Sequence, residues 1–111
     1  MRLHRNLVFT TIDSLMAIFN EGEYADKVVA RALKKDKRWG SHDRKFVAET
    51  IYEIVRWKRL YTEIAEVKEP FDRDKIWRIF AVWAVLRGYT LPDWKYFEET
   101  PVRRIKGRFD E

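Results

Sequence analysis

Two glutamates one helical turn apart are the residues whose type and spacing come nearest to acid–base chemistry. Glu49 and Glu53 are separated by four positions, and two neighbouring carboxylates can in principle share one proton. The same spacing, continued by three positions to Arg56, also suits ion pairs along a helix surface. Charged helix faces commonly carry such pairs. We therefore favour a structural role for these residues and predict no catalytic site here.

Other signatures of catalysis and metal binding are missing from the sequence. The four glycines do not group into a Walker or Rossmann phosphate-binding loop. His4 and His42 have no partner at the spacing of zinc ligands, and the chain has no cysteine. Ser14 and Ser41 lack a His–Asp pair, and Ser41 is expected to be a helix N-cap. We predict no catalytic residue, no metal site and no cofactor site in this chain.

Basic residues are the stronger functional candidates. The net charge of +5 favours polyanionic partners such as nucleic acid. Residues 27–45 contain eight lysines and arginines and only two aspartates. If these cations share one surface, they would bind phosphates with little sequence preference and with strong salt dependence. A merely solvated charged face is the open alternative. The candidate RNA-binding residues here are Arg31, Lys34, Lys35, Lys37, Arg38, Arg44 and Lys45.

The five tryptophans offer a second way to bind nucleic acid, because bases stack on aromatic rings. Trp57, Trp77 and Trp83 lie in apolar helical patterns, so we expect them in the core. Trp39 and Trp94 fall near predicted helix boundaries. Basic residues surround Trp39, which makes it the better stacking candidate. We still favour packing for Trp39, since tryptophans at helix boundaries often hold a loop against the core.

Apolar periodicity predicts the helices that position these residues. Apolar side chains recur at helical spacing in residues 3–20 and 24–35. The clearest pattern runs from Ser41 to about residue 65, and its wide apolar arc indicates a central helix with several neighbours. A fourth helix is expected from Asp72 to about residue 87, followed by a short helix within residues 91–97.

The fold class follows from these elements. No segment alternates with the period of a strand, so we predict an all-α bundle of about five helices over residues 1–98. Apolar residues make up 46% of the chain, which supplies one core. Residues 99–111 are basic and show no periodicity, so we expect a linker toward a further domain. With no long apolar run and no signal-peptide pattern, we expect a cytoplasmic protein without membrane contact.

A motif in the third predicted helix resembles a known family. Residues 42–57 read HDRKFVAETIYEIVRW and are similar to the Asp-Arg…Glu…Tyr…Arg-Trp stretch of NusB-like domains. Within the NusB-like domains, the motif most resembles the one in the N-terminal domain of the RsmB/Sun/NOP family of ribosomal RNA cytosine-5 methyltransferases. Residues 23–29 (EYADKVV) resemble that family's approach to its second helix. The likeness covers about residues 3–66 well and is weaker over residues 70–97.

The resemblance implies a NusB-like fold, a role in RNA recognition and no catalytic residue in this domain. It also implies a catalytic domain beyond residue 111 that uses S-adenosylmethionine, so rRNA and that domain are the expected partners. The free antitermination factor of the same fold binds RNA with a basic N-terminal region, to which Arg2 and Arg5 correspond. The motif residues expected to tie the helices together are Arg44, Glu49, Tyr52 and Arg56.

Three functions therefore stay open at the level of sequence. The leading hypothesis is an accessory domain that positions rRNA for a methyltransferase domain. The second is a scaffold that docks the catalytic domain through an apolar face near Trp77, Trp83 or Trp94, without RNA contact. The third is a free NusB-type antitermination factor.

Overall fold

The most apolar segment of the sequence forms a helix that is covered on all sides. In the computed structural model, which describes residues 2–98 and 100–110, helix α5 spans Arg73–Leu86. The Asp72 carboxylate accepts a hydrogen bond from the backbone N–H of Lys75 at 2.8 Å, which confirms the predicted N-cap. Every residue from Ile76 to Val85 except Arg78 is buried.

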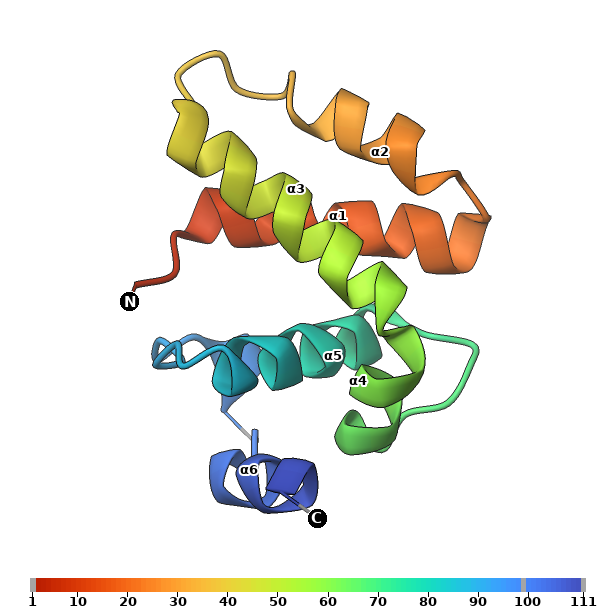
Figure 1. Cartoon of the computed structure of the whole chain (residues 1–111), viewed down its shortest axis with the longest axis vertical. Coiled ribbons are helices and arrows are strands. Elements are labelled where there is room, and N and C mark those ends of the chain that lie inside the picture. Colours follow the sequence, from red (N-terminus) through yellow and green to blue (C-terminus); the bar gives the residue numbers. More distant parts are fainter. Residues whose placement is uncertain (1, 99, 111) are drawn as a thin grey trace.

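The remaining elements pack on α5 directly or through one another (Figure 1). They are α1 (Arg5–Glu21), α2 (Ala25–Ala32), α3 (Ser41–Arg56), α4 (Lys58–Ala65), the short 3-10 helix η1 (Lys95–Phe97) and α6 (Val102–Asp110). Helix α1 packs on α2, α3 and α5, while α4, η1 and α6 contact α5 from other directions. The described residues contain no strand, so the predicted all-α fold is confirmed. None of their helices combines the length and apolarity needed to cross a membrane.

The long third helix predicted for residues 41–65 is two helices, so this prediction was wrong. The break lies at Trp57, whose φ of −108° and ψ of 32° leave the helical region. The Trp57 N–H still donates to the Glu53 carbonyl at 3.0 Å, and the Trp57 carbonyl accepts from Tyr61 N–H at 3.1 Å. Helical hydrogen bonding thus continues on both sides while the chain changes direction. As a result α4 packs against α5 and α6 (Figure 1).

Two further expectations about the third helix need correction. Helix α5, not α3, is the helix that is buried almost all round. Ser41 is the first helical residue, and Gly40 occupies the N-cap position without a side-chain cap hydrogen bond. Because the cap lies one residue earlier than expected, the Ser41 hydroxyl does not serve as the predicted cap.

The basic C-terminal segment has regular structure, which the sequence did not indicate. Of residues 99–111, Glu99 and Glu111 lie outside the described part, but Val102–Asp110 form α6. Ile105 is only 3% exposed and joins the hydrophobic core. The Arg104 guanidinium pairs with the Glu66 carboxylate of the α4 C-terminus at 2.7 Å. Residues 102–110 therefore form a helix packed on the core, although the sequence shows no helical periodicity there, and a role of residues 99–111 as a linker toward a further domain stays a prediction.

The burial of Ile105 makes α6 a measurable part of the stability of the domain. We expect Ile105→Ala to lower the free energy of unfolding by about 2 kcal/mol, the low end for a buried isoleucine because a terminal helix can shift to close the cavity. Urea denaturation followed by circular dichroism measures this change. The neighbouring exposed residue provides the control, since Lys106→Ala should change stability by less than about 0.5 kcal/mol. Equal stability of the two variants would show that α6 does not pack on the core.

Candidate nucleic-acid interface

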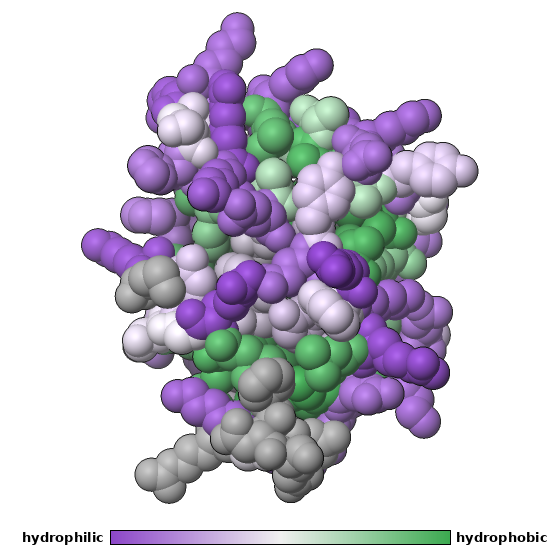
Figure 2. Space-filling view, viewed as in Figure 1, coloured by the Kyte–Doolittle hydropathy of each residue, from purple (hydrophilic) through white to green (hydrophobic). Residues whose placement is uncertain are grey.

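The connection between α2 and α3 gathers cations at one end of the molecule. We term this surface the basic turn, and its residues are Lys34, Lys35, Lys37, Arg38, Arg44 and Lys45. Figure 1 shows the connection at the opposite end from α6, and Figure 2 shows hydrophilic side chains projecting from that end. Val28, Val29 and Ala32 hold α2 against the core, so the turn is placed by apolar packing rather than by its charges.

The side chain of Trp39 holds the basic turn against the hydrophobic core. Its side chain is 7% exposed and belongs to the hydrophobic core. The predicted packing role is confirmed, and Trp39 does not offer a stacking surface for bases. The indole Nε1 is buried without a hydrogen-bond partner among the described residues. Packing of the ring therefore outweighs the cost of leaving this donor unpaired.

All nine predicted RNA-binding side chains are exposed. Four of them already have a carboxylate partner, which the sequence analysis did not anticipate. The pairs are Arg31–Glu23 at 2.9 Å, Lys35–Asp13 at 3.6 Å, Arg38–Asp36 at 2.8 Å and Lys45–Glu49 at 4.0 Å. Lys34, Lys37 and Arg44 form no ion pair with any side chain in the described part of the chain. These three are therefore the cations of the basic turn with charge available for a ligand.

The pair between Arg38 and Asp36 shapes the turn itself. Arg38 donates from Nε to Oδ1 at 3.0 Å and from Nη2 to Oδ2 at 2.8 Å, and its backbone N–H donates to Oδ1 at 2.9 Å. The side-chain hydrogen bonds, followed by the backbone one, lower the pKa of Asp36 to about 2. The same pairing raises the pKa of Arg38. Arg38 thus closes the turn and adds no net charge to the surface.

Arg2 and Arg5 lie on a different surface from the basic turn. With the segment that follows α5, they border a hollow of about 450 Å³ that includes Leu91, Pro92 and Trp94 and no basic-turn residue. The Arg5 guanidinium carbon lies 5.1 Å from the Trp94 ring centroid, at the distance of a cation–π contact. The structure therefore separates Arg2 and Arg5 from the other predicted site residues.

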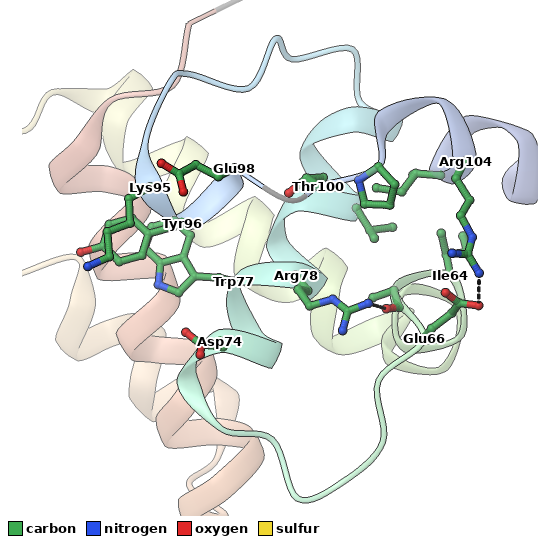
Figure 3. A pocket seen from close by; sticks show the side chains of 14 residues that line it. Ile64, Glu66, Asp74, Trp77, Arg78, Lys95, Tyr96, Glu98, Thr100 and Arg104 are labelled. Atoms are coloured by element: carbon green, nitrogen blue, oxygen red, sulfur yellow. Dashed lines mark hydrogen bonds and ion pairs between the residues drawn. The ribbon is translucent and has the colours of Figure 1, made fainter.

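A larger cleft opens between α4, α5, η1 and α6 (Figure 3). Its volume is about 780 Å³, and the Trp77 and Tyr96 rings stack at one side with centroids 4.3 Å apart. Arg78 donates to the Ala65 carbonyl at 2.8 Å across the middle of the view. The charged side chains that line the cleft are Arg78, Lys95, Arg104, Glu66, Asp74 and Glu98. Among the described residues that line the cleft, three cations balance three carboxylates, so these side chains give no net preference for an anion.

The glutamate pair considered for acid–base chemistry is structural, as predicted, but Arg56 was the wrong partner. The Glu53 carboxylate accepts from Trp83 Nε1 at 2.6 Å and from Arg87 Nε at 2.9 Å, which ties α3 to α5 and the residue that follows it. Glu49 pairs with Lys45 on its own helix. The Arg56 guanidinium lies over the Trp57 ring, 5.3 Å from the centroid. Two carboxylates held by separate partners are not an acid–base pair.

The motif residues expected to join helices behave differently from one another. Tyr52 does so, because its hydroxyl donates to Asp26 Oδ1 of α2 at 2.6 Å and this hydrogen bond raises the pKa of Tyr52. Arg44, Glu49 and Arg56 make no interhelical ion pair among the described residues. The residue that joins helices instead is Glu53, whose partners lie at least 30 positions later in the sequence.

The tryptophans divide into core residues and one exposed residue. Trp77 and Trp83 are 2% and 4% exposed, as predicted. Trp57 was expected in the core, but its exposed fraction is 48% because the helix breaks at this residue. A run of cationic neighbours, Arg56 before it and Lys58 and Arg59 after it, was the sequence signal for exposure. Trp94 is half-buried beside Arg5.

Metal binding and known relatives give no other candidate. No group of three or more histidine, aspartate or glutamate side chains among residues 2–98 and 100–110 could hold a metal ion. Comparisons of the chain with protein-family models, with curated proteins and with solved structures find no match. The resemblance of residues 42–57 to NusB-like domains therefore stays a prediction, and the function has to be argued from the surface.

The pKa of Asp36 tests the geometry of the basic turn directly. It lies below the ordinary value of 3.8, so the pairing favours the folded state above pH 3.8 and this contribution is lost as the pH falls toward 2. Titration of carboxyl resonances by NMR should place Asp36 near pH 2. We expect Arg38→Ala to raise this pKa, because the guanidinium hydrogen bonds are lost, and to leave it below the ordinary value, because the backbone N–H of residue 38 still donates to Asp36. Arg31→Ala, which removes the partner of Glu23 instead, should leave Asp36 unchanged. A wild-type Asp36 that titrates near 3.8 would contradict this geometry.

Proposed function

We propose that this chain is a non-catalytic RNA-binding domain of an S-adenosylmethionine-dependent rRNA cytosine-5 methyltransferase. It would position rRNA for a catalytic domain of the same polypeptide. One observation carries the RNA-binding part of the proposal. Lys34 and Lys37 on the connection between α2 and α3, and Arg44 in the first turn of α3, are exposed and have no carboxylate partner in the described part of the chain.

The chemistry of this surface suits phosphates. Lysine and arginine bind phosphate oxygens through charge-assisted hydrogen bonds and release counterions from the nucleic acid. Arg44 lies in the first turn of α3, at the positive end of a 16-residue helix whose first turn also carries Asp43. Phosphate contacts fix the position of the nucleic acid without reading its sequence. Such binding suits an accessory domain, because the choice of the modified base would then lie with the catalytic domain.

The methyltransferase part of the proposal rests on the family resemblance. The all-α architecture agrees with what the resemblance implies, and the Tyr52–Asp26 hydrogen bond gives one motif residue the interhelical role expected of it. S-adenosylmethionine would be held by the catalytic domain, since no part of the proposal places it on this chain.

The two alternatives receive different support from the surface. Of the three tryptophans considered for a docking scaffold, Trp77 and Trp83 are buried in the core of this domain, which disfavours docking through them. Trp94 is half-buried and borders the hollow beside Arg2 and Arg5, so it is the one that could still meet a partner domain. A free NusB-type antitermination factor would bind RNA with its N-terminal region, to which Arg2 and Arg5 correspond, and these two residues lie on a different surface from the basic turn. Assaying the full polypeptide for methyl transfer to rRNA separates that alternative from our proposal.

Charge reversal at the three unpaired cations tests the proposal. The variant Lys34→Glu, Lys37→Glu, Arg44→Glu should bind rRNA fragments roughly tenfold or more weakly at low salt. The slope of log affinity against log salt concentration should become shallower by about 2 to 3, since each lost phosphate contact contributes ~0.7–0.9. Fluorescence anisotropy across a salt series measures both quantities.

A matched variant controls for net charge. Lys68→Glu, Lys95→Glu, Lys106→Glu changes the charge equally at exposed positions outside the basic turn. This control should keep most of the affinity and nearly the full salt slope. Equal losses in the two variants would mean that RNA responds to net charge alone, and unchanged affinity in the basic-turn variant would refute the proposal.

A further inference from the structure

A second surface combines exposed aromatic rings with unpaired cations. We term it the aromatic face, and its residues are Tyr24, Lys27, Tyr52, Arg56 and Trp57. The exposed fractions are 75% for Tyr24, 42% for Tyr52 and 48% for Trp57. Aromatic side chains dominate cores because they bury so much area. Three exposed rings on the neighbouring helices α2 and α3 and their caps therefore form a candidate ligand-binding surface.

Contacts between α2 and α3 place the rings on one surface. Tyr24 is the N-cap residue of α2, and Asp26, two residues later, accepts the hydrogen bond of the Tyr52 hydroxyl. Arg56 follows Tyr52 by one helical turn on α3, and its guanidinium covers the Trp57 ring. Tyr52 is thus tied to α2 close to Tyr24, and Arg56 connects the Trp57 ring to the same helix one turn beyond Tyr52.

Trp57 is held in place by the backbone rather than by core packing. Its N–H and its carbonyl both make helical hydrogen bonds, to the Glu53 carbonyl and from the Tyr61 N–H. The side chain nevertheless projects from the break between α3 and α4 and stays half exposed. Because its backbone is fixed, this half-exposed ring loses little backbone entropy when a flat ligand stacks on it beside the Arg56 guanidinium.

The charges of this region favour a nucleic acid over an apolar protein partner. Two of its carboxylates are paired with arginines, Glu53 with Arg87 and Glu23 with Arg31, while Asp26 accepts the Tyr52 hydroxyl and keeps its charge. Lys27 and Arg56 form no ion pair with the described residues, and each lies near an aromatic ring, at 6.0 Å and 5.3 Å from the centroid. Proteins that bind single-stranded nucleic acid combine aromatic rings, on which bases stack, with cations that bind the phosphates.

We propose that the aromatic face binds an unpaired RNA segment by stacking bases on Trp57, Tyr52 and Tyr24, with Arg56 and Lys27 on the flanking phosphates. This inference rests on the proposed function and adds the class of RNA. Bases in a duplex are stacked on one another and do not present their faces, whereas single-stranded loops and ends do. The basic turn binds phosphates of either form, so the aromatic face supplies the preference for single strands.

Two RNA probes of equal length test the inference on the whole chain. One is an unstructured oligouridylate of roughly 12 nucleotides, within the usual range of single-strand site sizes, and the other is an RNA duplex of the same length. We expect Trp57→Ala to weaken binding of the single strand about tenfold, the effect of losing one stacked base. Binding of the duplex should not change. Trp57→Phe, which keeps a ring, should retain most of the affinity.

Tryptophan fluorescence gives an independent signal. Trp39, Trp77 and Trp83 are buried and Trp94 is half-buried, so base stacking should quench mainly the emission of Trp57. The oligouridylate should therefore quench the wild-type protein and not the Trp57→Phe variant. Tyr24→Ala changes a residue that is 75% exposed and makes no side-chain cap hydrogen bond, so it provides a second test that does not depend on the helix break.

The outcomes separate this inference from the proposed function. If Trp57→Ala and Tyr24→Ala bind the single strand like the wild type, while the basic-turn variant loses affinity for both RNAs, the inference is wrong and the proposed function stands. If the wild type binds neither RNA at low salt, both fail. If Trp57→Ala abolishes self-association in sedimentation without changing RNA affinity, the aromatic face is a protein interface and the inference is again wrong. Circular dichroism melts confirm that each variant folds.

Discussion

The rest of the structure depends on the need to cover α5. A helix that is apolar around nearly its whole circumference cannot face water on any side, because each fully buried large side chain is worth about 1.5–3 kcal/mol relative to its exposed state. Helix α1 covers one side, α4 and η1 cover others, and α6 completes the cover. The break at Trp57 belongs to the same requirement, since a straight helix from residue 41 to residue 65 would not bring α4 onto α5. Between Ile76 and Val85, Arg78 is the one exposed residue, and its guanidinium holds the end of α4 through the Ala65 carbonyl.

Sequence patterns were informative where burial and local capping decide the structure. Apolar periodicity predicts helix α5 and the burial of Trp77 and Trp83 within it. The N-cap at Asp72 follows from the chemistry of that single residue. The break at Trp57 was not visible, because helical hydrogen bonds and apolar residues continue on both sides of it. Helix α6 was not visible either, since Ile105 is its one buried residue among those described and a single apolar position has no period.

The charges of the candidate site were also predictable in part from the sequence and in part only from the fold. Exposure of all nine predicted cations could be foreseen, and so could the pair of Lys45 with Glu49 one turn away. The partner of Lys35 is Asp13, which comes from α1 and could be found only from the fold. Exposed ion pairs of this kind contribute at most about 1 kcal/mol to stability. Their larger effect is on recognition, because they remove paired charges from the surface and concentrate the available charge on Lys34, Lys37 and Arg44.

The order of helix contacts has a consequence for how the chain reaches this structure. Most packed pairs are neighbours or next neighbours in sequence, such as α1 with α2 and α3, and α4 with α5 and α6. The contact between α1 and α5 joins these two groups over the longest span, with side-chain bonds from Glu53 to Trp83 and Arg87 beside it. Local contacts cost little loop entropy and favour rapid folding. The two groups can therefore form early and independently, and the docking of α1 on α5 is the step that makes their folding one cooperative event.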